Sequence, residues 1–66
     1  MRKIYVVENC KSGKIYFDST DIQEVLDYLR QEGFGLNVLD DIKADLEKGF
    51  SQVRAQYRIG VKFYSI

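Results

Sequence analysis

The segment from residue 53 to residue 63 alternates strictly between apolar and polar side chains, and this period of two restricts the fold more than any other feature of the sequence. Every odd position is apolar, whereas the even positions hold arginine, glutamine, glycine or lysine. Such alternation is typical of a β-strand with one buried and one solvent-exposed face. An unbroken strand of this length would be unusual, so we expect Gly60 to mark a bend or a bulge. The alternative is a second hairpin that turns at Ile59 and Gly60.

The amino-terminal part of the chain predicts a β-hairpin. Residues 3–8 and 14–18 are rich in β-branched and aromatic side chains, and the polar stretch 9–13 between them ends in glycine. Two such runs joined by a short loop that contains glycine are a typical hairpin pattern. We therefore expect these two segments to pair as antiparallel strands.

The middle of the chain begins with a predicted amphipathic helix. Thr20 and Gln23 have the spacing of a capping box, and Gly33 stands where a left-handed residue would end the helix. The apolar residues recur on one face at helical spacing: Ile22, Val25, Leu26 and Leu29. This segment therefore predicts a helix with one buried stripe.

A second helix is predicted over about residues 38–48. Asn37 would cap it, and Gly49 would follow its last turn. Its apolar positions are Val38, Leu39, Ile42 and Leu46. In the alternative, residues 36–38 form a short strand and the helix begins near Asp40.

Together these elements predict a small single α+β domain over residues 1–66, in the order β-β-α-α-β. We expect an antiparallel sheet with the two helices packed on one face. A chain of 66 residues is short, and a domain of that size buries only about 60% of the surface that it exposes when unfolded. The core is therefore expected to be small, and the other face of the sheet would meet water or a partner.

Several classes of protein are at odds with the composition. No window approaches the run of about 18 apolar residues that spans a membrane, and the apolar run 4–7 is too short for the core of a signal peptide. Cys10 is the only cysteine and histidine is absent, so neither an internal disulfide nor a Cys/His zinc site is expected. We therefore expect a cytoplasmic protein without a cofactor or a metal.

The chain has no net charge, but its charges are segregated. Ten acids balance ten cations over the whole sequence. Residues 1–17 and residues 50–66 each carry a net charge of +3, whereas residues 18–49 carry −6. The predicted strands are therefore basic and the predicted helices acidic.

The alternation also predicts which side chains line the uncovered face of the sheet. The side chains expected to face the helices are Ile4, Val6, Ile15, Phe17 and the odd positions of 53–63. The opposite face would then hold the tyrosines and cations of the strands, together with Val7. The predicted partner-binding residues on that face are Lys3, Tyr5, Lys14, Tyr16, Arg54, Arg58, Lys62 and Tyr64.

Such an aromatic and basic face has three interpretations. Tyrosine and arginine are enriched in protein interfaces, but a solvated antiparallel face can carry them through cross-strand pairing alone. Stacking on tyrosines and contacts of cations with phosphates would suit single-stranded nucleic acid, although a neutral chain has little general affinity for phosphates. We favour a protein partner and keep nucleic acid as the alternative. A free sheet edge would also permit self-association.

The acids of the second predicted helix are another candidate surface. Asp40, Asp41 and Asp45 lack the loop glycine and the closing glutamate of a calcium hand. A run of charge like this is typical of a solvated helix face. The less favoured alternative is that the acidic helical face docks on a basic protein.

Catalytic chemistry has little support in the sequence. Without histidine there is no imidazole base, and no pair of carboxylates has a spacing that indicates cooperation. Cys10 lies in the predicted hairpin loop, as expected for an incidental, exposed surface thiol. We therefore predict a small stand-alone, non-enzymatic binding protein that acts stoichiometrically on a larger macromolecule, as a regulator or an inhibitor.

Overall fold

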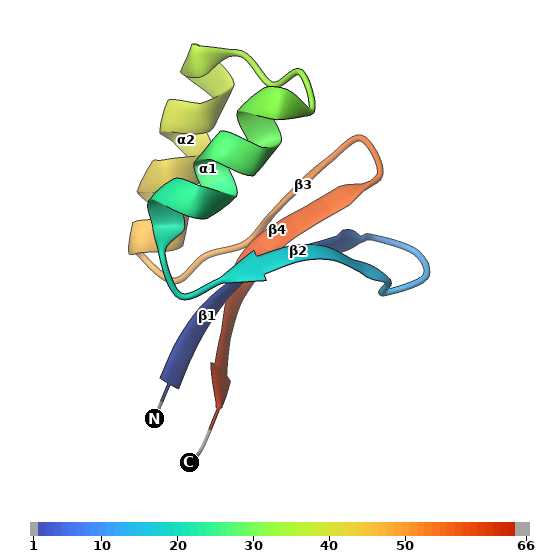
Figure 1. Ribbon diagram of the computed structural model, residues 1–66, viewed down its shortest axis with the longest axis vertical. Coiled ribbons are helices and arrows are strands. Elements are labelled where there is room, and N and C mark those ends of the chain that lie inside the picture. Colours follow the sequence, from blue (N-terminus) through green and yellow to red (C-terminus); the bar gives the residue numbers. More distant parts are fainter. Residues whose placement is uncertain (1, 65–66) are drawn as a thin grey trace.

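Residues 2–64, which the computed structural model describes, form one antiparallel sheet of four strands and two helices (Figure 1). In chain order the elements are β1 (Arg2–Asn9), β2 (Ile15–Ser19), α1 (Ile22–Gln31), α2 (Leu36–Glu47), β3 (Gln52–Arg54) and β4 (Tyr57–Tyr64). The strands lie in the order β2-β1-β4-β3, and both helices lie on one face of the sheet (Figure 1). The predicted α+β class is confirmed, with one strand more than expected.

The first and last strands of the chain lie side by side at the centre of the sheet. β1 pairs with β4 along its whole length, from Arg2 opposite Tyr64 to Asn9 opposite Tyr57. β2 pairs with the other edge of β1 and completes the first hairpin, as predicted. The central pair is therefore flanked by an edge strand on each side.

The first hairpin contains a β-bulge. Phe17 lies opposite Val7, but Ile15 lies opposite Glu8, so β2 has one residue more than β1 at this point. Tyr16 is that extra residue. A bulge re-aims the side chains around it, which changes the face on which the end of β2 presents its residues.

The alternating carboxy-terminal segment is a hairpin and not one long strand. β3 pairs antiparallel with β4, and Ala55 and Gln56 form the turn between them, with Ala55 at the left-handed φ of 54°. The alternative turn at Ile59 and Gly60 is also wrong, because both residues lie inside β4. The apolar–polar alternation continues through the turn, so the pattern itself does not mark where the first strand ends.

The turn of two residues exchanges the faces of the odd and even positions. Residues directly opposite each other in an antiparallel pair share a face. Val53 lies opposite Arg58, and Arg54 lies opposite Tyr57. The odd residue of β3 therefore shares a face with the even residues of β4, contrary to the expectation for a single strand.

The first helix confirms the prediction except for its cap. Asp21 is the N-cap residue instead of Thr20, because its carboxylate accepts a hydrogen bond of 2.9 Å from the backbone N–H of Gln23. Gly33 follows the helix with a φ of 103°, which confirms the predicted left-handed residue.

The second helix begins slightly earlier than predicted. α2 starts at Leu36, so the alternative in which residues 36–38 form a strand is wrong. Gly35 is its N-cap in place of Asn37, and no side chain bonds to the first turn. Gly49 follows the last turn with a φ of 83°, as expected for a left-handed end. Within residues 2–64, neither helix is long and apolar enough to cross a membrane.

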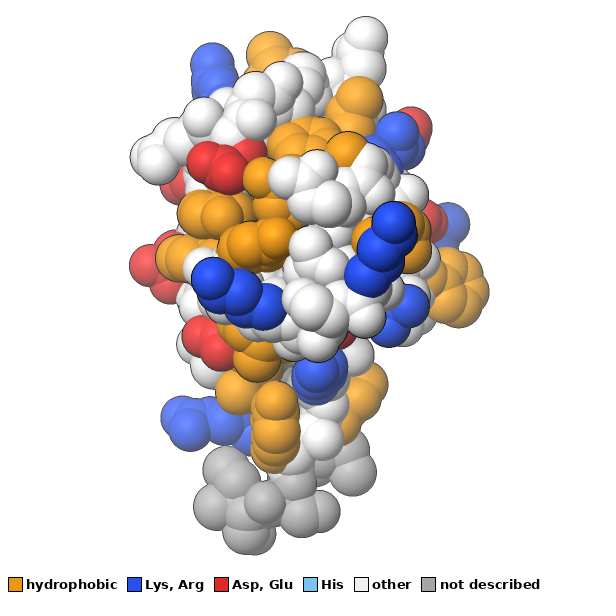
Figure 2. All heavy atoms as spheres, turned by 90° about the vertical axis from the view of Figure 1, so that its right-hand side faces the viewer, with side chains coloured by type: hydrophobic (Ala, Val, Ile, Leu, Met, Phe, Trp, Pro, Cys, Tyr) orange, Lys and Arg blue, Asp and Glu red, His pale blue; other side chains and the backbone are white. Residues whose placement is uncertain are grey.

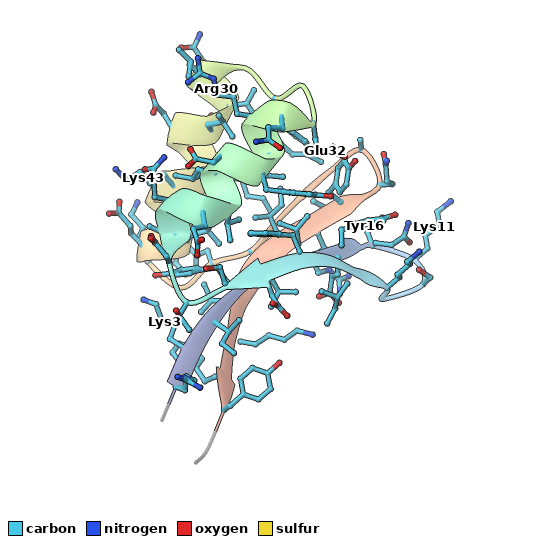
Figure 3. The ribbon with its side chains drawn as sticks, in the orientation of Figure 1. Lys3, Lys11, Tyr16, Arg30, Glu32 and Lys43 are labelled. Carbon is cyan, nitrogen blue, oxygen red and sulfur yellow. The ribbon has the colours of Figure 1, made fainter. Side chains whose placement is uncertain are left out.

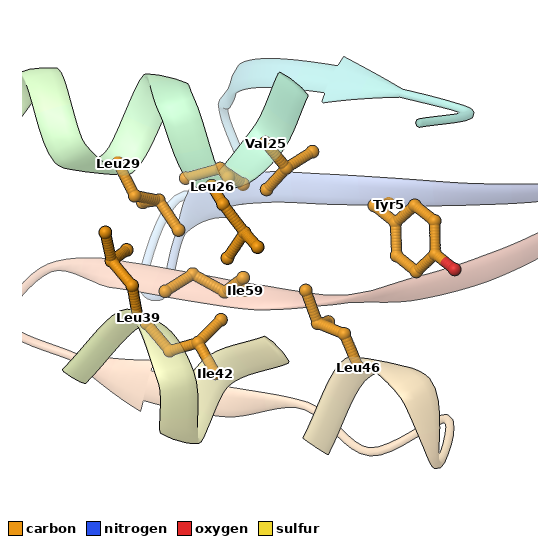
Figure 4. Close-up of a cluster of buried hydrophobic side chains, with 9 residues drawn as sticks. Tyr5, Val25, Leu26, Leu29, Leu39, Ile42, Leu46 and Ile59 are labelled. Atoms are coloured by element: carbon orange, nitrogen blue, oxygen red, sulfur yellow. The ribbon is translucent and has the colours of Figure 1, made fainter. Parts of the chain in front are cut away.

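The core lies between the two helices and the central strands (Figure 4). It is a single cluster of buried side chains: Tyr5, Val7, Val25, Leu26, Leu29, Leu39, Ile42, Leu46 and Ile59. Each fully buried aliphatic side chain of this kind contributes about 1.5–3 kcal/mol relative to an exposed one. The cluster therefore holds the helices on one face and leaves the other face of the sheet for contacts with solvent or a partner.

Candidate partner-binding surface

The face of the sheet turned away from the helices, called the open face below, follows from the strand pairing. Glu8 lies opposite both Ile15 and Arg58, and Arg58 also lies opposite Val53. These residues share a face, and the neighbouring pairs extend it. The open face consists of Arg2, Ile4, Val6, Glu8, Ile15, Asp18, Val53, Arg58, Gly60, Lys62 and Tyr64.

β1 is turned the opposite way from the prediction. Tyr5 and Val7 face the helices and are 8% and 0% exposed, whereas Ile4 and Val6 lie on the open face. All four of these residues are apolar, so alternation within β1 could not decide between the two faces. The pairing with β4 decides, because Val7 lies opposite the buried Ile59.

Part of the predicted set does lie on the open face. Arg58, Lys62 and Tyr64 are placed there by their pairing with β1. Lys3 instead shares the helix-covered side with Tyr5, and its ammonium lies 5.3 Å from the centre of the Tyr5 ring. The prediction that these five residues share one surface is therefore wrong for the two on β1.

Arg54, another predicted open-face residue, binds to α2 on the helix-covered side. Its guanidinium lies 3.8 Å from the carboxylate of Asp41 and donates a 2.8 Å hydrogen bond to the side chain of Gln52. The Gln52 amide in turn donates a 2.6 Å hydrogen bond to Asp45. Two acids of the predicted solvated cluster therefore attach β3 to α2, while Asp40 stays exposed.

Tyr16 also packs on the helix-covered side, because the bulge turns it inward. Its ring lies edge-on to that of Tyr57 with the ring centres 5.3 Å apart, and its hydroxyl accepts a 3.0 Å hydrogen bond from Asn9. Figure 3 shows Tyr16 on the side of the hairpin tips, which are the loop between β1 and β2 and the turn between β3 and β4. It lies below the end of α1 that is next to Glu32. Lys14, the last member of the predicted set, lies in the exposed loop before β2.

The hydroxyl of Tyr57 links the second hairpin to α1. It donates a 2.9 Å hydrogen bond to Glu32, and this bond, together with burial, raises the pKa of Tyr57 to about 12. Burial and the neighbouring Glu32 carboxylate also raise the pKa of Tyr28. The tyrosines near the hairpin tips are therefore used for internal packing.

The charges of the open face are arranged around one acid. Glu8 is only 13% exposed in its side chain, and the Lys62 ammonium lies 3.6 Å from its carboxylate. Lys62 starts opposite Ile4, so its side chain must run past Val6 to reach Glu8. Val6 is 2% exposed although it lies on the open face.

Apolar side chains are exposed beside these charges. Ile15, Val53 and Tyr64 are 47%, 56% and 44% exposed. Figure 2, viewed from the side of the hairpin tips, shows apolar side chains between separate lysine and arginine side chains. Ile15 and Val53 were not predicted to lie on the open face, since both were expected to face the helices. The bulge places Ile15 on the open face, and no turn residue at positions 55–56 signalled the reversal at Val53.

The central strands project beyond the rest of the sheet as a two-stranded ribbon. The pairing of β2 with β1 ends at Tyr5, and that of β3 with β4 ends at Ile59. Residues 2–4 of β1 and residues 62–64 of β4 therefore form a ribbon, which extends away from the helices in Figure 1. Phe63, on the side opposite Tyr64, is 57% exposed.

The remaining candidate groups are few. Cys10 is half-buried and not fully exposed, because its loop contacts the second hairpin: its backbone N–H donates a 2.8 Å hydrogen bond to the carbonyl of Gln56. Among the described residues, no group of three or more acids, cysteines or histidines is placed to hold a metal ion. No protein-family model matches the chain, and comparisons with curated proteins and with solved structures give no match.

Proposed function

We propose that this protein binds a larger protein stoichiometrically through the open face and the ribbon, and acts as a regulator or an inhibitor, not as an enzyme. The observation that carries the proposal is the exposure of Ile15, Val53 and Tyr64 beside Arg58 and Lys62. Tyrosine and arginine are enriched at protein interfaces, and the exposed aliphatic side chains beside them add apolar surface that a partner can bury.

The ribbon supports an extended protein segment as part of the partner. Within the described residues, the outer edges of its two strands have no strand beside them. Such edges carry backbone groups that pair with added strands. Phe63 on one side of the ribbon and Tyr64 on the other would give such a segment an aromatic contact.

Single-stranded nucleic acid remains the alternative ligand for the same surface. Binding of this kind uses several exposed rings on which bases stack. Tyr64 is on the open face, but Tyr5 and Tyr16 pack on the covered side. Glu8 and Asp18 also lie on the open face, where they would oppose phosphates. These positions favour protein over nucleic acid.

The cytoplasm is the proposed setting. Cys10, the one cysteine of the sequence, is a free thiol. Free thiols persist in compartments that are kept reducing. A regulator that acts there would meet its partner as a folded domain with an open sheet face.

The test is affinity capture followed by mass spectrometry, with matched pairs of variants. The open-face variant Val53→Ser/Arg58→Ala removes one exposed aliphatic and one cation. Its control, Leu36→Ser/Lys43→Ala, makes the same chemical changes on α2, where Leu36 is 61% exposed and Lys43 points away from the sheet (Figure 3). Circular dichroism checks that both variants remain folded.

The expected result is one protein that is captured by the wild type and by the control but not by the open-face variant. Calorimetric titration of that purified protein should then give a one-to-one complex. Equal capture by the open-face variant would refute the proposal. Binding of a labelled single-stranded oligonucleotide that weakens steeply with salt and is lost in the open-face variant would establish the alternative.

A further inference from the structure

The outer edge of β2 lies next to a groove on the helix-covered side of the sheet. The groove has a volume of about 220 Å³ and is lined by Phe17, Glu24, Asp27, Tyr28 and Gln31. Phe17 comes from β2 and the other four residues from α1. The groove is therefore bounded by a strand on one side and a helix on the other.

The helical wall of the groove follows from sequence spacing. Glu24, Asp27, Tyr28 and Gln31 stand at i, i+3, i+4 and i+7, so they form one stripe along α1. The ring of Tyr28 stacks on that of Phe17, with 4.9 Å between the ring centres and 5° between the planes. This stacked pair forms an apolar floor between the strand edge and the two carboxylates.

The strand side of the groove has backbone groups available for pairing. β2 is the first strand in the order β2-β1-β4-β3, and no strand of residues 2–64 pairs with its outer edge. A strand added to this edge would lie about 4.8 Å from β2. That position lies alongside the α1 stripe, so one side of the added strand would face Phe17 and Tyr28.

The negative charge of the groove favours a basic ligand. Glu24 accepts a hydrogen bond from the hydroxyl of Ser19, and Asp27 accepts one of 3.0 Å from the side chain of Gln23. Both carboxylates are thus oriented, but no cation of the described chain lies within ion-pair distance of either. A second copy of this chain that paired through β2 would bring two such acidic stripes together, and the like charges would repel each other.

We propose that this groove binds an extended basic segment of a partner protein, which adds to β2 as a fifth strand. Its backbone pairs with the free edge of β2. One apolar side chain contacts Phe17 and Tyr28, and lysine or arginine side chains on either side of it reach Glu24 and Asp27. The site is separate from the open face, because Phe17 and Ile15 lie on opposite faces of the sheet.

The probe is an end-blocked peptide, Thr-Lys-Thr-Val-Thr-Lys-Thr, whose valine and lysines share one side of an extended strand and suit either strand direction. Its counterparts carry glutamate in place of lysine, or N-methyl groups on backbone amides of both edges, so that neither strand direction can pair normally with β2. Binding is followed by nuclear magnetic resonance. The amides of residues 15–19 and 24–31 are expected to shift with the lysine peptide. N-methylation should weaken binding about tenfold by removing backbone hydrogen bonds.

Charge variants of the protein complete the test. Glu24→Gln/Asp27→Asn should weaken binding of the lysine peptide about fivefold to tenfold, since two exposed ion pairs are lost. Asp18→Asn, the same kind of change on the open face of β2, should leave binding within about twofold. Equal binding of the glutamate peptide, equal binding of the N-methylated peptide, or shifts confined to other residues would each overturn the proposal. Val53→Ser/Arg58→Ala should bind the peptide as the wild type does, so failure of the open-face proposal is measured independently.

Discussion

The helix-covered face and the open face of the sheet are built from the same two central strands, yet they use tyrosines and cations differently. On the covered face, Tyr57 donates to Glu32 and Arg54 binds Asp41, so polar side chains find partners on the helices. On the open face, Arg58 lies opposite Glu8 and Val53, and Tyr64 lies opposite Arg2. Residue type alone therefore does not determine the face on which a side chain lies; what matters is whether the helices offer it a partner.

The largest expected contrast between the two faces is in the loss of stability when isoleucine is shortened. Ile59 is 0% exposed on the covered face, whereas Ile15 is 47% exposed on the open face. Ile59→Ala should cost about 2–5 kcal/mol, which approaches the whole stability of a domain this small. Ile15→Ala should cost about 0.5 kcal/mol or less. Urea unfolding followed by circular dichroism measures both, and equal losses would show that the open face is covered by another part of the molecule.

A substitution of Gly60 tests whether the open face is tightly packed at its centre. A Cβ built on Gly60 would lie 2.9 Å from the Cβ of Ser51, which is closer than packed carbon atoms approach. Gly60→Ala should therefore cost about 1–3 kcal/mol through overpacking. Ser51→Gly should restore much of that loss, because it removes the atom that is struck. A double-mutant cycle in urea gives the coupling, and purely additive losses would contradict this account.

On the covered face, Gln52 joins β3 to α2. Its amide donates to Asp45 at 2.6 Å and to the backbone carbonyl of Asp41 at 3.3 Å. Gln52→Ala should destabilise the protein by about 1 kcal/mol and speed amide hydrogen exchange in β3. Val53→Ala, at the next residue on the open face, is the control and should leave exchange in β3 unchanged. If exchange in β3 were as slow in Gln52→Ala as in Val53→Ala, β3 would be held by its backbone hydrogen bonds alone.

The smallest expected effect is the pH dependence contributed by Tyr57. Its pKa is raised to about 12 from an ordinary value of 10.0, so the folded state retains the proton more firmly than the unfolded state does. This contribution is fully present below pH 10 and is lost as the pH rises towards about 12. Tyr57→Phe should make the stability fall less steeply over that window. Tyr64→Phe on the open face is the control, and an unchanged profile in Tyr57→Phe would refute the role of the Glu32 bond.

The parts of the fold that were predictable from sequence are those with local signals. Gly13 between two β-rich runs marked the first hairpin, and the stripe from Ile22 to Leu29 marked α1. The turn at Ala55 and Gln56 has no glycine, asparagine or aspartate, which are the residues that usually supply a positive φ in such turns. Because the alternation runs through it unbroken, the pattern was compatible with one long strand.

The candidate surface was less predictable because face assignment depends on pairing between distant segments. Residues 4–7 are apolar at both odd and even positions, so β1 alone has no preferred face. Its orientation is set by the register with β4, and that of Tyr16 by a bulge that appears only when β2 pairs with β1. Lys62 and Tyr64 were placed correctly because β4 itself alternates from Tyr57 onward.

The pairing of β1 with β4 also determines how the domain would respond to mechanical force. Arg2 lies opposite Tyr64, so the two ends of the described chain leave the sheet at the same place. Hydrogen bonds between antiparallel strands run perpendicular to the strands. Pulling the ends apart would therefore load these bonds one after another and peel the central strands open like a zipper, at lower tension than shearing them along their length.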